Sequence, residues 1–204
     1  MQNKKETLQP DSFYHIYSRA NGNEKLFISD PNFRFFLEKY KLYFHPIVYT
    51  YCYCLMPNHF HFLVQIKNEN EVMEHFRKEH PNLQGFENLE GLISKQFSRF
   101  LNSYAKAFNK QQGRKGSLFM HTFKRKRIVS RQYLLKLIHY IHYNPIQAGL
   151  CLQMTEWNYS SYEGLLSKSS TLLQRDKVIE WFDDNENFIF IHQQIPKELS
   201  IVFD

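Results

Sequence analysis

The sequence predicts an α+β domain with a ferredoxin-like βαββαβ order, which is an antiparallel sheet with helices on one face. Two observations predict this fold. Residues 13–128 alternate short β-prone segments with long segments of helical periodicity, and a tight connection, MPNH, joins two consecutive strands. The 204-residue chain is long enough to bury one sizeable core, and its 19 Phe and 13 Tyr make it rich in aromatic side chains.

The first half of the chain contains three predicted strands and one helix. FYHIYSR (13–19) is β-prone and ends at the turn signal ANGN. Residues 30–44 carry apolar side chains at helical spacing, with Asp30 as the expected N-cap and Pro31 in the first turn. IVYTYCYCL (47–55) and FHFLVQI (60–66) are predicted to be two adjacent strands.

The second half is predicted to add two helices and one strand. Residues 67–90 are expected to form a short helix and a loop, and residues 92–108 show the spacing of an amphipathic helix. LFMHTFKRKRIVS is predicted to be a strand or hairpin arm, followed by a helix over RQYLLKLIHYIHYN. Pro145 is expected to stop or kink this last helix, and Gly149 suits a terminating turn.

The chain is predicted to divide into a main domain over residues 1–155 and an acidic C-terminal extension over residues 156–204. The extension has a net charge of −5 and is expected to contain one helix near residues 175–184. It is predicted to pack on the main domain or to be appended to it.

Positive charge is concentrated in one segment. Residues 91–155 contain twelve Lys and Arg and no Asp or Glu, whereas the rest of the chain holds the other 14 basic residues and all 20 acidic ones. Such segregation favours a surface that binds a polyanion, in particular nucleic acid. The expected phosphate contacts are Arg114, Lys115, Lys124, Arg125, Lys126, Arg127 and Arg131.

The cellular location of the protein is predicted from the absence of a membrane-spanning run and of a signal peptide in the sequence. No apolar run approaches the roughly 18 residues that span a membrane, and the first ten residues have no apolar stretch of a signal peptide. Three cysteines do not form a disulfide framework. We therefore expect a reduced, cytoplasmic protein without a membrane partner.

A pair of histidines lies inside the apolar run YCLMPNHFHFLVQI. Because residues i and i+2 of a strand point to the same face, His59 and His61 are expected to project side by side, with Phe60 and Phe62 on the opposite face. Two imidazoles in this arrangement suit a metal ion, which would need a third ligand from elsewhere. The alternatives are ordinary buried or exposed histidines, or a zinc site that includes Cys52 and Cys54.

The segment KLIHYIHYNPIQAGL (136–150) is the best candidate to supply the third metal ligand. Tyr140 and Asn144 are four residues apart on one helix face, and Lys136 lies one turn earlier. The phenol is a latent nucleophile, the amide oxygen is a neutral ligand, and the ammonium could lower the pKa of the phenol or contact a phosphate. The alternative is that Tyr140 is an ordinary packing or solvated tyrosine.

Several motifs, in the right order, resemble one family. YCLMPNHFHFLV followed some eighty residues later by YIHYNPIQAGL, together with YHIYSRANGNEKLF, GSLFMHTFKRK and WNYSSY, resembles the single-tyrosine HUH transposases, most closely the REP-associated tyrosine transposase branch. The resemblance covers roughly residues 12–162. It implies an HUH domain over residues 1–155 that cuts and rejoins single-stranded DNA.

The resemblance also implies roles for individual residues. His59, His61 and Asn144 would hold a divalent metal, Mg²⁺ or Mn²⁺, and Tyr140 would attack DNA to form a 5′-phosphotyrosine intermediate, with Lys136 as a candidate aid to its ionisation. The expected partner is single-stranded or hairpin DNA, with a homodimer as a possible assembly. The alternatives are a domesticated, non-catalytic DNA-binding protein of the same fold, and a zinc hydrolase that uses His121, His139 or His142.

Overall fold

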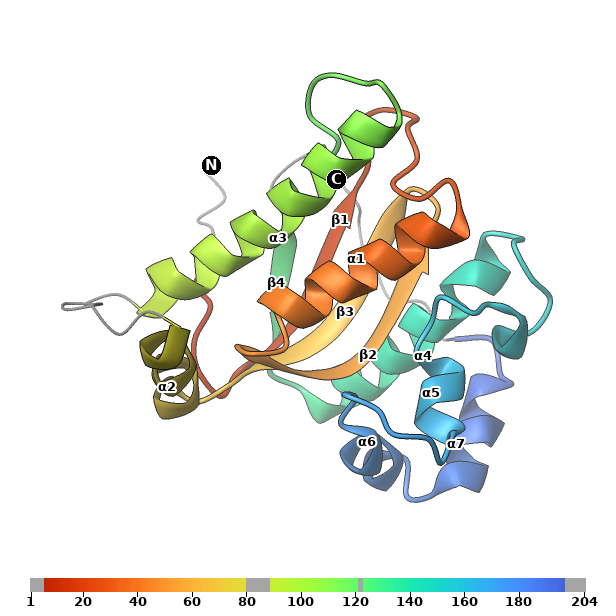
Figure 1. The fold of residues 1–204 in the computed structure, drawn as a ribbon. Coiled ribbons are helices and arrows are strands. Elements are labelled where there is room, and N and C mark those ends of the chain that lie inside the picture. The colour runs from red at the N-terminus through yellow and green to blue at the C-terminus, as the bar shows by residue number, and fades with distance from the viewer. Residues whose placement is uncertain (1–5, 80–88, 121–122, 197–204) are drawn as a thin grey trace, which may run out of the picture.

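Four strands form one antiparallel sheet in the order β2-β3-β1-β4 in the computed structural model of the protein (Figure 1). The structure describes residues 6–79, 89–120 and 123–196. The strands are β1 (Phe13–Arg19), β2 (Val48–Met56), β3 (His59–Ile66) and β4 (Lys124–Ile128). Helix α1 (Asp30–Tyr43) connects β1 to β2, and helices α2 (Glu69–Glu79) and α3 (Leu89–Gln111) lie between β3 and β4. The predicted ferredoxin-like order is confirmed.

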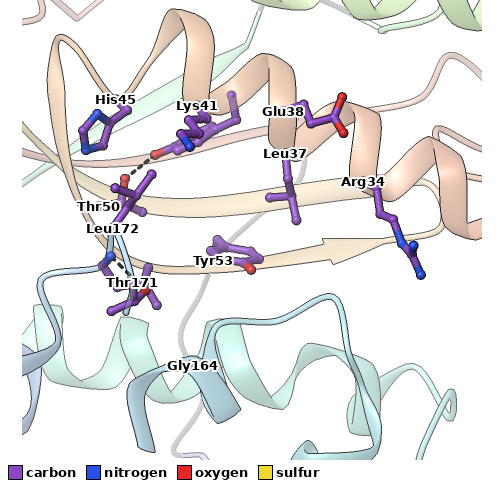
Figure 2. Close-up of a pocket in the computed structure, with 12 residues that line it drawn as sticks. Arg34, Leu37, Glu38, Lys41, His45, Thr50, Tyr53, Gly164, Thr171 and Leu172 are labelled. Carbon is purple, nitrogen blue, oxygen red and sulfur yellow. Dashed lines mark hydrogen bonds between the residues drawn. The ribbon is translucent and has the colours of Figure 1, made fainter. Parts of the chain in front are cut away.

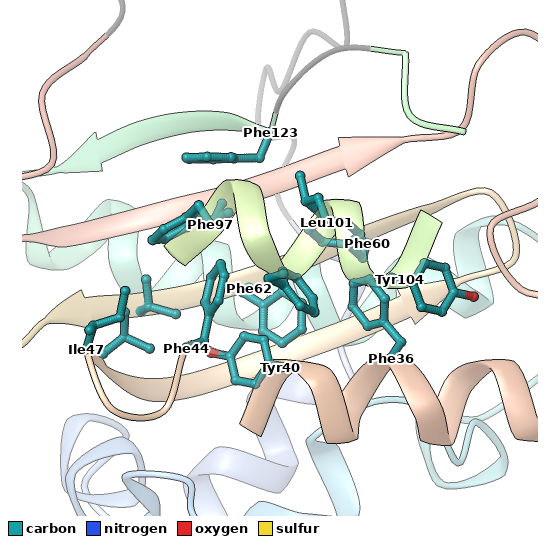
Figure 3. Close-up of a cluster of buried hydrophobic side chains, with 14 of the residues drawn as sticks. Phe36, Tyr40, Phe44, Ile47, Phe60, Phe62, Phe97, Leu101, Tyr104 and Phe123 are labelled. Carbon is teal, nitrogen blue, oxygen red and sulfur yellow. The ribbon is translucent and has the colours of Figure 1, made fainter. Parts of the chain in front are cut away.

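Helices α1 and α3 cover one face of the sheet and enclose a core of stacked aromatic rings (Figures 1 and 3). We call this the first core. Phe36 of α1 is fully buried at its centre. Its ring lies 5.1 Å from Phe60 of β3, 4.7 Å from Phe100 of α3 and 4.9 Å from Tyr104 of α3. One side chain therefore links both helices to the sheet.

Replacing Phe36 by alanine should lower the free energy of unfolding by about 3–5 kcal/mol, because it removes a buried ring and leaves a cavity. Leu42 lies on the same helix but is 55% exposed, so Leu42→Ala should change stability by less than about 0.5 kcal/mol. Urea unfolding of the two variants measures the difference. Equal effects would show that Phe36 does not join the layers.

The opposite face of the sheet is also covered, by helix α4 (Arg131–Gln147) and by the C-terminal segment (Figure 1). The C-terminal elements are a 3₁₀ turn (Met154–Glu156), α5 (Tyr162–Leu166), α6 (Arg175–Trp181) and α7 (Asn185–His192). These elements and the sheet enclose a second core, whose buried members are Tyr51, Cys52, Cys54, Met56, Leu63, Ile128, Leu134, Leu137, Ile138, Ile141, Met154, Tyr162, Leu165, Val178, Phe182 and Phe188. α1 and α3 lie on one face, as predicted, and α4 with the extension forms a third layer.

One local prediction was wrong, and two were incomplete. The N-cap of α1 is Ser29, and Asp30 is the first helical residue. Helix α4 continues through Pro145 to Gln147, so the proline does not stop it, although Pro145 has no N–H to donate to the carbonyl of Ile141. The helix predicted near residues 175–184 is confirmed by α6, and the described part of the C-terminal segment also contains α5 and α7, which were not predicted. Gly149 does follow the helix in a left-handed conformation, with φ of 67°, as expected for a terminating turn.

The C-terminal segment contacts the outer edge of β2. Ser160 pairs with Cys54 and Leu173 pairs with Thr50 as isolated bridges. The indole N–H of Trp157 donates to the carbonyl of Leu55 over 3.0 Å. An exposed strand edge is a template for pairing with other chains, so these contacts protect β2. Within the described ranges, no helix is both long and apolar enough to cross a membrane.

A chain of buried histidines joins α7 to α4. His192 Nε2 lies 3.0 Å from His142 Nδ1, and His142 Nε2 lies 2.8 Å from the Ser161 hydroxyl. The ring of His139 lies 5.0 Å from that of His192. Burial lowers the pKa of His192 to about 3, a hydrogen bond to the Phe188 carbonyl opposes this, and His139 adds to it.

The protein should therefore lose stability as the pH falls below about 6.5. Between pH 6.5 and 3 the unfolded chain binds a proton at His192 that the folded protein excludes, which costs about 1.4 kcal/mol per pH unit. Urea unfolding at pH 7, 6 and 5 measures the slope. His192→Phe should reduce this slope by the contribution of one bound proton, which is about 1.4 kcal/mol per pH unit. An unchanged slope in the variant would assign the acid sensitivity to other groups.

Candidate functional site

The two histidines project from the same face of β3. Phe60 and Phe62 belong to the first core, and Leu63 belongs to the second. Because side chains alternate along a strand, His59 and His61 share the face of Leu63, which is the one covered by α4. We call this the histidine face. Their ring centroids lie 5.1 Å apart, as two successive same-face side chains require.

Helix α4 brings Tyr140 and Asn144 to this pair. The ring of Tyr140 meets the ring of His61 edge to face at 5.7 Å. Asn144 lies close enough to His59 and Tyr140 to influence the pKa of both side chains, and its amide donates to the Tyr140 carbonyl over 2.7 Å. Leu137, Ile138 and Ile141 are fully buried in the second core and hold this face of the helix against the sheet. The four residues picked out in the sequence therefore converge.

Burial keeps both imidazoles neutral near pH 7. It lowers the pKa of His59 to about 4, which the hydrogen bond with Asn144 opposes and the charge of Arg19 reinforces. Burial, followed by the neighbouring His15 and His59, lowers the pKa of His61 well below its usual value. A neutral imidazole keeps one nitrogen lone pair, which is the form that coordinates metals.

The Tyr140 phenol is protonated at neutral pH. Burial raises its pKa to about 12; the Asn144 hydrogen bond opposes this rise, and Tyr133, Cys54 and Tyr17 add to it. Lys136 is half-buried one turn earlier on α4, and it is not among the groups that shift this pKa. Its part in ionising the phenol stays a prediction.

The side chains at this point fit a divalent cation. His59 Nδ1 lies 2.7 Å from Asn58 Oδ1. Because an amide oxygen can only accept, Nδ1 carries the proton and Nε2 keeps its lone pair. In the part of the chain that the structure describes, no three His, Cys, Asp or Glu side chains are grouped so that they could hold a metal ion. A third ligand from the described residues would thus have to be of another kind, and the Asn144 amide lies at this point.

The zinc alternatives find little support among the described residues. Cys54 pairs with His61 across β2 and β3, but burial raises the thiol pKa well above its usual value and disfavours the thiolate that zinc requires. His139 and His142 are buried beside His192 in the second core. His121 lies outside the described residues.

The basic run at β4 is divided between the two faces of the sheet. Lys124 pairs with Tyr17 and Lys126 pairs with His15, so these lysines lie on the histidine face. Arg125 and Arg127 alternate to the face of α1 and α3, where the guanidinium of Arg125 lies 5.4 Å from the ring of Phe123. All four residues of KRKR were predicted from the sequence to contact phosphates, without a division between faces.

The other predicted phosphate contacts differ in availability. Arg114 forms an ion pair with Glu24 and hydrogen bonds with Asn109 and Ser117, so its charge is largely engaged. Lys115 and Arg131 are exposed.

Three residues of β1 belong to the site and were not identified from the sequence. His15, Tyr17 and Arg19 alternate onto the histidine face. Tyr17 pairs with His61, Arg19 pairs with His59, and His15 Nε2 lies 2.8 Å from His61 Nδ1. Burial, together with the nearby charge of Lys126, lowers the pKa of His15 to about 3. The spacing of the three residues in YHIYSR could have indicated a shared face, but not that this face meets β3.

A cavity of about 510 Å³ lies away from this site, between α1, the edge of β2 and residues 164–173 (Figure 2). Tyr53 and Thr50 line its floor from the first-core side of β2, and Thr50 Oγ1 lies 2.7 Å from the Tyr40 hydroxyl. Arg34, Glu38 and Lys41 of α1 stand along its rim. It contains none of the predicted site residues.

Comparisons with known proteins confirm the resemblance drawn from the motifs. No family model matches the chain. A Haemophilus influenzae protein named "Putative REP-associated tyrosine transposase" is 28% identical over 115 residues, which are 55% of this chain and 58% of that protein. The matched part is thus somewhat over half the length of the relative. A solved structure of a REP-associated tyrosine transposase bound to a REP hairpin has a TM-score of 0.54 and 12% identity over 85% of this chain and 94% of its own, a likeness of fold.

Proposed function

We propose that the protein is a metal-dependent endonuclease and strand transferase for single-stranded or hairpin DNA, acting through a 5′-phosphotyrosine intermediate. The observation that carries the proposal is the convergence of Tyr140 and Asn144 of α4 with His59 and His61 of β3. Further support comes from the names of the relative and of the structural neighbour, which are both REP-associated tyrosine transposases. The structural neighbour is bound to a hairpin.

His59, His61 and the Asn144 amide would hold a divalent cation, Mg²⁺ or Mn²⁺. When bound, this cation would supply positive charge that polarises the scissile phosphate and offsets negative charge in the transition state. Asn144 also donates to the backbone carbonyl of Tyr140, which would hold the amide beside the residue that carries the nucleophile.

Tyr140 Oη would attack the phosphorus in line. The new O–P bond replaces the bond from phosphorus to the 3′ oxygen, the phenolic proton is lost to solvent, and the leaving 3′ oxygen gains a proton. The resulting 5′-phosphotyrosine conserves the energy of the phosphodiester, so a second DNA 3′-OH can reverse the step without ATP. A phenol with a pKa near 12 needs help to ionise, and Lys136 is the proposed source from the chain.

A denaturing gel with a single-stranded or hairpin oligonucleotide and Mn²⁺ tests the proposal. Wild-type protein should form a band that survives denaturation, carries a label placed at the 3′ end of the oligonucleotide and disappears on protease treatment. Saturable DNA binding without any such band would instead identify a non-catalytic DNA-binding protein. Strand cleavage without a protein-linked product would identify a hydrolase.

Lys124 and Lys126 are proposed to bind backbone phosphates beside the site, since they lie on the histidine face. The double variant Lys124→Gln/Lys126→Gln should weaken DNA binding and flatten its dependence on log salt by about 0.7 per lost phosphate contact. Titrations by fluorescence anisotropy between 50 and 200 mM salt measure this slope.

The matched control is Lys168→Gln/Lys177→Gln, which removes the same charge from exposed positions of the C-terminal segment. Its slope should equal that of the wild type. Equal slopes in both double variants would argue that net charge, and not the position of the lysines, governs binding.

A further inference from the structure

A third histidine lies directly behind the pair. His15 of β1 is completely buried, and its Nε2 lies 2.8 Å from Nδ1 of His61. The rings of His15 and His61 lie 5.0 Å apart at 20°, and the ring of Tyr17 stacks on His15 at 4.7 Å and lies 6.0 Å from that of His61. His15 therefore contacts His61 through one nitrogen and packs against the ring of Tyr17.

A hydrogen bond between two neutral imidazoles can be arranged in two ways. If His61 donates from Nδ1, its Nε2 keeps a lone pair that can face a cation; if His15 donates from Nε2, the proton of His61 must be on its own Nε2, which then cannot be a ligand. His59 already has the first arrangement, because its Nδ1–H donates to the amide oxygen of Asn58 and its Nε2 keeps the lone pair. Only the first arrangement gives both histidines the same outward lone pair.

The other nitrogen of His15 supports a role in this contact. Nδ1 is buried and, among the described residues, has no hydrogen-bond partner. A buried polar atom without a partner costs free energy that a phenylalanine at this position would not. The imidazole is therefore explained by its bond to His61 and not by packing.

We infer that His15 is a positioning residue that holds His61 in the Nδ1–H tautomer and directs its Nε2 to the cation site. The inference rests on the proposed function, since the cation is part of that proposal. Partners of this kind behind metal-binding histidines fix the orientation of the ring and its tautomer.

The first test needs no metal and no DNA. Two-bond ¹H–¹⁵N spectra of histidine-labelled full-length protein report which ring nitrogen carries the proton, and His61→Gln assigns the His61 signals. We expect the Nδ1–H tautomer in the wild type and a shift toward Nε2–H in His15→Phe. An Nε2–H tautomer in the wild type, or an unchanged Nδ1–H tautomer in His15→Phe, would overturn the inference.

The second test is Mn²⁺ binding by electron paramagnetic resonance, again on the full chain without DNA. His15→Phe keeps the stacked ring and should raise the Mn²⁺ dissociation constant about tenfold or more. His15→Gln places an acceptor near the position of Nε2 and should stay within about threefold of the wild type. His192→Phe removes an equally buried His–His hydrogen bond elsewhere and should bind Mn²⁺ as the wild type does.

The outcomes separate the two proposals. If the wild type does not bind Mn²⁺, or if His61→Gln binds it equally well, the cation in the proposed function is wrong. The ¹H–¹⁵N spectra then still test whether His15 sets the tautomer of His61. If the wild type binds Mn²⁺ through His61 but His15→Phe binds it equally well, only the inference about His15 fails. A loss of affinity in His192→Phe as large as that in His15→Phe would likewise overturn it, because general loosening of the fold would then explain both.

Discussion

Tyr140→Phe should abolish the covalent protein–DNA adduct and leave DNA affinity within about twofold of the wild type. Phenylalanine lacks the attacking oxygen but keeps the ring that meets His61 edge to face at 5.7 Å. The variant should therefore fold and present the same surface to DNA. The denaturing gel measures the adduct, and fluorescence anisotropy measures the affinity.

The matched control for this variant is Tyr143→Phe, on the next turn of the same helix. Its ring packs against the second core and lies 6.2 Å from that of His139, so adduct formation should persist. An adduct in Tyr140→Phe would contradict our assignment of the nucleophile. The next phenol to examine would then be Tyr17, which pairs with His61 across the sheet.

Replacing His61 should have the second largest effect. His61→Gln should weaken Mn²⁺ binding by more than about 100-fold and reduce adduct formation in proportion. Glutamine fills much of the space of this completely buried side chain, so the loss should not follow from unfolding. Mn²⁺ titration, adduct yield at saturating DNA and the melting temperature are the three measurements.

The control is His45→Ala, because His45 lines the cavity between α1 and β2 and not the histidine face. It should change neither Mn²⁺ affinity nor adduct yield. If His61→Gln keeps full adduct yield while its melting temperature is unchanged, the reaction does not depend on this imidazole. A drop in melting temperature alone would place His61 among the structural histidines.

Local periodicity made much of the site predictable. The alternation of a strand puts His59 and His61 on one face, and the helical repeat puts Tyr140 and Asn144 on another, whatever the rest of the fold does. The same rules located all four strands. They misplaced the N-cap of α1 at Asp30 and the end of α4 near Pro145, where the choice between neighbouring end positions depends on single hydrogen bonds. In the C-terminal segment they found α6 but missed α5 and α7, because short helices have little periodicity.

The sequence by itself determined the direction in which each candidate side chain leaves its own element, because backbone geometry sets that direction residue by residue. Only the tertiary structure decided which of these faces meet. The second core packs α4 over β3 and brings the phenol and the amide to the histidines. The pairing of β1 with β3 and β4 places His15 against His61 and brings Lys124 and Lys126 to the same face. Such contacts depend on apolar surfaces far apart in the chain, whose pairing no local pattern encodes.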